Sequence, residues 1–133
     1  MIPETNNWFR ESIIDMAFPK NDKTFYWTNH VKGKMMFYRL SAQKIRQVFN
    51  DPKREEEGIA PKTFAAMRRN DTKKRKEEIW VMYCRLLPAS EKFKVKSSKV
   101  ILISAWRYPG ISKRGKQIPI PEEILNEIKK EWF

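Results

Sequence analysis

The 133-residue sequence predicts a small α+β protein, because segments with helical and strand-like patterns follow one another in separate runs. Residues 29–50 repeat apolar side chains at the three-and-four spacing of short amphipathic helices. Residues 77–87 and 98–106 are β-rich and apolar enough along their length to form central strands. A hydrophobic content of 41% with 13% aromatic residues is typical of a globular chain.

The length of the chain favours one domain over residues 1–133. We expect its core to span about residues 23–108, with a helix at residues 6–18 before it and a helix at residues 121–132 after it. No internal repeat is visible.

The first predicted helix, at residues 6–18, spaces four apolar residues at helical intervals and ends at a proline. These residues are Trp8, Phe9, Ile13, Met16 and the terminating Pro19. The run TFYWTN that follows is rich in aromatic and β-branched residues, which predicts a strand that places His30 at its end.

Two short helices are expected over residues 29–50. Ser41 is a good N-cap for the second helix, and Ile45, Val48 and Phe49 give that helix one buried face. Pro52 stops it. The charged, glycine- and proline-containing residues 53–63 then favour a loop.

The centre of the chain contains the sheet. Residues 63–69 suit a strand or a short helix, and residues 70–76, which contain no apolar side chain, suit a hairpin connection or an exposed loop. The linker between the strands at 77–87 and 98–106 is short and polar, so we expect those strands to form an antiparallel hairpin.

The final helix should begin at Pro121, with two acids in its first turn that complement the helix dipole. An apolar stripe indicates that this helix docks on the domain or on a second copy of the chain, as in a homodimer. The stripe contains Ile124, Leu125, Ile128 and Trp132.

The formal net charge is +12, and the positive charge is concentrated in the middle of the chain. Residues 51–116 hold 18 Lys and Arg against 8 Asp and Glu. Such a balance favours a polyanionic partner, with nucleic acid first, an acidic protein second and a merely solvated surface as the alternative. The single cysteine, Cys84, excludes an intramolecular disulfide, and no apolar run is long enough to span a membrane, so a cytoplasmic protein without a membrane partner is expected.

The sequence lacks the residues that several classes of enzyme need. One histidine and one distant cysteine leave no metal-ligand set, and the four glycines form no phosphate-binding loop. No Gly-x-Ser-x-Gly motif supports a serine hydrolase. We therefore expect no cofactor, and metal-free phosphodiester chemistry remains as the candidate reaction.

Cleavage of RNA through its 2′-hydroxyl needs a general base, a general acid and cations near one phosphate. The candidates for these catalytic roles are His30, Lys34, Arg39, Lys62 and Arg107. Each has a structural alternative. His30 would cap a helix or bond a backbone group, Lys34 would lie on the solvent face, and the two arginines would form ion pairs. The alternative partners are residues 55–57 for Arg39, and Glu123 or Glu127 for Arg107.

A cluster of bases indicates nucleic-acid binding without requiring catalysis. The predicted contact residues are Arg68, Arg69, Lys73, Lys74, Arg75 and Lys76. Trp106 and Tyr108 flank Arg107 at the end of the last strand, and they would stack on bases if they face outward or join the core if they face inward.

The residues from His30 onward resemble a bacterial and archaeal domain family of unknown function with the motif His-Ala-x-x-Arg-Met-x-x-Arg-x-Ile-Ser. Here the motif residues are His30, Met35 and Ser41, while Val31, Lys34 and Tyr38 replace its alanine and arginines. The chain also resembles the related BrnT toxins of the RelE and ParE type. The matches are the helix ending Val48, Phe49, Asp51 and Pro52, and the strand Ile103 to Arg107, in which Trp106 replaces an arginine.

This resemblance implies an antiparallel sheet of three to four strands with two short helices packed on one face. It also implies a metal-free endoribonuclease and an antitoxin-like acidic partner. The leading hypothesis is thus an RNA-binding protein that resembles this toxin type, and whether it also cleaves RNA is left open by the sequence. The alternatives are a non-catalytic nucleic-acid-binding module and an interaction protein that binds an acidic partner.

Overall fold

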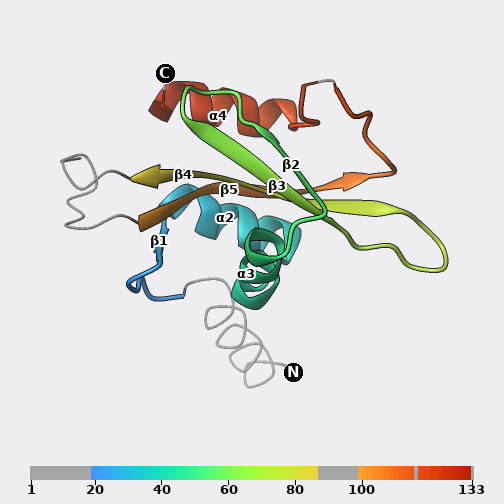
Figure 1. The fold of residues 1–133 in the computed structure, drawn as a ribbon, viewed down its shortest axis with the longest axis horizontal. Coiled ribbons are helices and arrows are strands. Elements are labelled where there is room, and N and C mark those ends of the chain that lie inside the picture. The colour runs from blue at the N-terminus through green and yellow to red at the C-terminus, as the bar shows by residue number, and fades with distance from the viewer. Residues whose placement is uncertain (1–18, 87–98, 116, 133) are drawn as a thin grey trace, which may run out of the picture.

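The computed structural model describes residues 19–86, 99–115 and 117–132, and these form a five-stranded mixed sheet with helices on both faces (Figure 1). The strand order is β1-β5-β4-β3-β2. β1 pairs with β5 in parallel, and every other neighbouring pair is antiparallel. The strands are β1 (Phe25–Trp27), β2 (Arg54–Glu57), β3 (Thr63–Arg69), β4 (Glu77–Leu86) and β5 (Lys99–Pro109).

Helices α2 (Asn29–Tyr38) and α3 (Ala42–Asn50) lie on one side of the sheet, and α4 (Glu122–Trp132) lies on the other (Figure 1). The α+β class and the pair of short helices are confirmed. Ser41 caps α3 as predicted, because its hydroxyl accepts a hydrogen bond from the Lys44 amide at 3.0 Å. The predicted helix at residues 6–18 lies outside the described residues.

The predicted antiparallel sheet of three to four strands was wrong in two respects: β1 pairs with β5 in parallel, and Arg54–Glu57 forms an edge strand where we expected a loop. Its charged residues carry no strand pattern, but its backbone pairs with β3 in the register Arg54↔Met67 to Glu57↔Phe64. Only one side chain of this strand, Arg54, is buried. The strand therefore depends on tertiary pairing rather than on its own sequence preference.

The antiparallel pairing of β4 with β5 is confirmed, and both strands are buried on both faces. Two separate cores result. Beneath α2 and α3 the core contains Phe25, Trp27, Val31, Met35, Leu40, Ala42, Ile45, Val48, Ala66, Ile79, Val81, Tyr83, Val100, Leu102 and Ala105. Beneath α4 it contains Ala65, Met67, Trp80, Met82, Ile101, Ile103, Trp106, Ile118, Ile124 and Ile128.

The short β1 determines where α2 lies. β1 pairs only with the first half of β5, from Phe25↔Val100 to Trp27↔Leu102. Thr28 then ends the strand, accepting a hydrogen bond from the Val31 amide and donating one to the Leu102 carbonyl at 2.8 Å. These two hydrogen bonds, one to the helix and one to the strand, fix the first turn of α2 beside β5.

Helix α4 docks on the sheet within the chain, as predicted, because Ile124 and Ile128 are buried in the second core. Glu122 and Glu123 occupy its first turn, as the dipole argument required. Across the described residues, no helix combines the length and the apolar character needed to cross a membrane.

Candidate nucleic-acid interface

His30 lies in the first turn of α2 and points inward, with 4% of its side chain exposed. Its Nε2 shares a hydrogen bond of 2.9 Å with Ser104 Oγ on β5, and its Nδ1 lies 3.6 Å from Glu127 Oε2 on α4. One turn further, Lys34 Nζ lies 2.8 Å from Glu127 Oε1. His30 and Lys34 therefore join α2 to β5 and α4.

The surroundings of His30 favour the neutral form of its imidazole. Burial lowers the pKa of His30 below 6.5, an effect that the nearby Glu127 carboxylate opposes and Lys34 reinforces. The hydrogen bond from Lys34 lowers the pKa of Glu127. A neutral, enclosed histidine between partners suits a structural role, since a general base must reach a substrate.

Arg107 holds the C-terminal end of α2. Its Nε donates to the Tyr38 carbonyl at 2.7 Å, and its Nη2 donates to the Arg39 carbonyl at 3.2 Å. Its Nη1 pairs with Glu77 Oε2 at 2.7 Å. Arg39 has a left-handed backbone, with φ 57°, that ends the helix. Arg107 thus joins α2 to β4, rather than pairing with Glu123 or Glu127 on α4.

The predicted catalytic residues do not meet at one point. His30 and Arg107 act at opposite ends of α2, and the separation of eight positions from His30 to Tyr38 corresponds to about 12 Å of helix. Within the described residues, no group of three or more His, Cys, Asp and Glu side chains is arranged to hold a metal ion.

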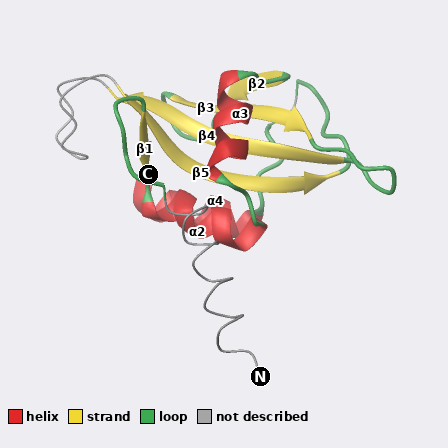
Figure 2. Ribbon diagram, turned by 90° about the horizontal axis from the view of Figure 1, so that it is seen from below, coloured by secondary structure: helices red, strands yellow, loops and turns green. Residues whose placement is uncertain are grey.

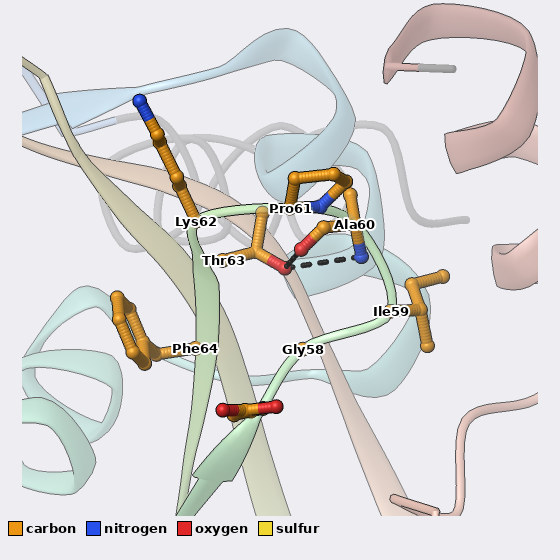
Figure 3. A pocket seen from close by; sticks show the side chains of 8 residues that line it. Gly58, Ile59, Ala60, Pro61, Lys62, Thr63 and Phe64 are labelled. Atoms are coloured by element: carbon orange, nitrogen blue, oxygen red, sulfur yellow. Dashed lines mark hydrogen bonds between the residues drawn. The ribbon is translucent and has the colours of Figure 1, made fainter.

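Lys62 lies elsewhere, in the turn between β2 and β3. This turn has φ 64° at Lys62 and borders a hollow of about 380 Å³. Thr63 Oγ1 fixes the turn by donating to the Ala60 carbonyl at 2.6 Å and accepting from the Ala60 amide at 3.2 Å (Figure 3). The Lys62 side chain extends away from these residues (Figure 3).

The predicted basic cluster divides into two groups. Arg68 and Arg69, at the end of β3, are engaged by acids: Arg68 pairs with Asp51 at 2.6 Å, and Arg69 pairs with Asp71 at 2.6 Å and with Glu78 at 3.1 Å. The hydrogen bond from Arg69 lowers the pKa of Asp71. These two arginines are thus largely neutralised within the protein.

The other four bases, Lys73 to Lys76, are exposed, and their side chains have no hydrogen bond or ion pair in the described part of the chain. They lie on residues 70–76, the basic tip, which projects from one end of the sheet (Figures 1 and 2). Thr72 Oγ1 orders the tip by accepting from the amides of Lys74 and Arg75 at 3.3 and 3.2 Å.

Of the two orientations considered for Trp106, the structure shows the inward one, so this ring offers no stacking surface. Trp106 is 0% exposed and stacks on Trp80 in the core beneath α4, with ring centroids 6.2 Å apart. Its position on a strand buried on both faces explains this. Tyr108 is half-buried against the same core. Among the described residues, the most exposed aromatic ring is that of Phe37 on α2, at 65%. The sequence analysis did not name it, although Phe37 lies about 200° around the helix from the buried Met35.

The sequence also did not predict the acids that form ion pairs with some of the basic residues and thereby determine which ones remain unpaired. Glu78 is 1% exposed and accepts from Arg69, from Trp80 Nε1 at 2.9 Å, and from the amide and hydroxyl of Ser112. The i, i+2 spacing of Arg69 and Asp71 was a usable signal, because alternate strand residues share a face. The pairing of Arg107 with Glu77 depends on the register of β4 and β5 and had no local signal.

Comparisons with known proteins identify no relative: no protein-family model, no curated protein and no solved structure matches this chain. The resemblance to BrnT and RelE-type toxins therefore stays a prediction from the motif residues.

Proposed function

We propose that this protein is a non-catalytic nucleic-acid-binding module whose basic tip contacts phosphates. The observation that carries the proposal is the set of four consecutive exposed bases, Lys73 to Lys76, whose side chains form no hydrogen bond or ion pair in the described residues. The nearest acids are already engaged by arginines, Asp71 by Arg69 and Glu77 by Arg107. The complement to such a tip is a polyanion.

An endoribonuclease, which the resemblance implies, has less geometric support. Cleavage through the 2′-hydroxyl needs a base and cations around one phosphate. His30 has 4% of its side chain exposed, and Arg107 is committed to α2 and Glu77. Binding by the tip requires none of these residues.

An acidic protein partner also fits the charge of the tip but not its other chemistry. Protein interfaces centre on apolar and aromatic side chains and are depleted in lysine. The tip, residues 70–76, contains no apolar residue. Nucleic acid, which binds through its phosphates, is the better complement.

The test compares two double variants with the same loss of charge. Lys73→Gln/Lys74→Gln changes the tip, and Lys129→Gln/Lys130→Gln changes the last turn of α4, at the opposite end of the molecule (Figure 1). Affinity for a mixed-sequence oligonucleotide is measured over a series of salt concentrations. The tip variant should lower the slope of log affinity against log salt by about 0.7 to 0.9 per lost contact, whereas the α4 variant should leave it nearly unchanged.

Two results would contradict the proposal. Equal effects of both variants would mean that net charge alone drives binding. Absence of binding by the unaltered protein at low salt would exclude nucleic acid as the partner.

A further inference from the structure

We infer that the basic tip inserts into the major groove of double-stranded DNA and contacts the phosphates on both sides of the groove, without reading the base sequence. This inference rests on the proposed function and specifies its ligand.

The tip continues the β3–β4 hairpin as a narrow ribbon beyond the regular strands, of which β3 ends at Arg69 and β4 begins at Glu77. The last pair of β3 with β4 is Arg69↔Glu78. The ladder continues through hydrogen bonds from the Asn70 amide to the Glu77 carbonyl and from the Thr72 amide to the Arg75 carbonyl, both 2.9 Å. The ladder of β5 with β4 ends at Glu77↔Pro109, and the Gly110 amide adds one more hydrogen bond, of 2.8 Å, to the Lys76 carbonyl. The ribbon thus extends past the sheet and closes at Lys73 and Lys74.

The ribbon carries positive charge on both faces. β4 begins at Glu77, and successive residues of a strand point to opposite faces. Extended over the two residues before β4, this alternation assigns Arg75 to the face of Glu77 and Lys76 to that of Glu78. Contacts identify the two faces. Glu77 pairs with Arg107, which holds α2, whereas Glu78 binds Ser112, which follows β5 on the other side.

Exposed bases flank the ribbon on both sides as well. Arg107 donates a hydrogen bond to the backbone carbonyl of Arg39, which places Arg39 beside the ribbon. The side chain of Arg39 is exposed and forms no hydrogen bond or ion pair in the described residues. On the other face, next to Ser112, the side chain of Lys113 is exposed. Arg54 Nη2 donates a hydrogen bond to the Lys113 backbone carbonyl at 3.0 Å. A double helix offers two phosphate strands to such a two-sided ribbon, whereas a single strand offers one backbone.

The width of the ribbon fits the major groove of B-DNA. The strands of a ribbon are about 4.8 Å apart, and the B-DNA major groove, about 12 Å wide, admits a two-stranded ribbon. The major groove of A-form RNA is deep and narrow. Single strands gain affinity by stacking on aromatic rings, which the tip lacks. The exposed ring of Phe37 is instead next to Lys34, whose charge is paired with Glu127.

The tip has few groups left to read bases. Asn70 Nδ2 donates to Glu77 Oε2 at 2.7 Å, the Asp71 carboxylate accepts from Arg69 and from the Glu77 amide, and Thr72 Oγ1 accepts from two amides. The remaining side chains are the lysines and Arg75. Both residue types contact guanine, but only Arg75 presents the planar fork that fixes the geometry of such a contact.

The experiment measures the affinity of the full chain for four probes of one sequence at one salt concentration. The probes are a DNA duplex, the same duplex with glucosylated hydroxymethylcytosines that fill the major groove, the RNA duplex and the single DNA strand. The unmodified DNA duplex should bind about tenfold more tightly than each of the other three, as expected for the loss of phosphate contacts. DNA duplexes of different base composition should bind equally.

Two single variants test both faces of the ribbon. Arg75→Gln and Lys76→Gln should each lower the salt slope on the DNA duplex by about 0.9. Both side chains are exposed, so the thermal unfolding of each variant should match that of the unaltered protein.

Three results would overturn the inference: equal or tighter binding of the single strand, no effect of glucosylation, or a slope change in only one variant. A guanine preference that Arg75→Lys abolishes would overturn sequence independence. In these cases Lys73→Gln/Lys74→Gln still changes the slope and the proposed function stands. If that variant behaves like the α4 variant, the proposed function itself fails.

Discussion

Arg107→Ala should lower the free energy of unfolding by about 2 to 4 kcal/mol. The substitution removes two hydrogen bonds to the last carbonyls of α2, at Tyr38 and Arg39, and an ion pair with Glu77. Hydrogen bonds from a charged donor contribute about 1.5 to 3 kcal/mol each when shielded from water. The Arg107 side chain is 30% exposed, which reduces that sum, but Glu77 is 9% exposed and would lose its cationic partner.

The assay is denaturant unfolding followed by circular dichroism. A midpoint of thermal unfolding lower by about 5 to 15 °C would accompany the loss in a chain of this size. Arg107→Lys is the matched control, since it keeps the charge but cannot reach three partners, and it should recover part of the loss. A change below about 0.5 kcal/mol for Arg107→Ala, the range of ordinary surface substitutions, would refute the structural role assigned to Arg107.

Two further predictions concern His30 and Gly58. Burial lowers the pKa of His30, so the unfolded chain takes up the proton first, and stability should be complete above pH 6.5 and fall as the pH drops through 6.5 toward the folded pKa. His30→Gln should flatten this part of the stability curve in a pH series of thermal melts, and an unchanged curve would contradict the assignment. Gly58→Ala should lower stability by about 1 to 3 kcal/mol, because the new Cβ would overlap Thr63 Oγ1 in the turn before β3. Gly33→Ala, whose Cβ meets no atom, should instead raise stability by about 0.5 to 1 kcal/mol in denaturant unfolding, and equal effects of the two substitutions would refute this explanation.

The sequence predicted the positive charge of the candidate site but not which of its basic side chains form ion pairs in the folded chain. The clustering of bases at residues 68–76 is visible in the chain, and so is the lack of apolar residues at the tip. Which of those bases remain free depends on acids from other elements. Asp51, at the end of α3, reaches Arg68, and only the folded chain brings the two together. The same holds for Arg107, whose partners are 30, 68 and 69 residues away in sequence.

The sequence by itself determined the elements whose side chains follow a strong local pattern. The cap at Ser41, the apolar face of α3, the apolar runs of β4 and β5, and the stripe of α4 were all readable, because burial imposes its periodicity on each segment. Only the tertiary structure decided β2, which is held by backbone pairing with β3, and the enclosure of His30 between β5 and α4. The physical reason is that backbone hydrogen bonds and contacts between distant segments leave no periodic trace in the sequence, so a lone histidine or a charged edge strand looks the same whether it faces water or a partner.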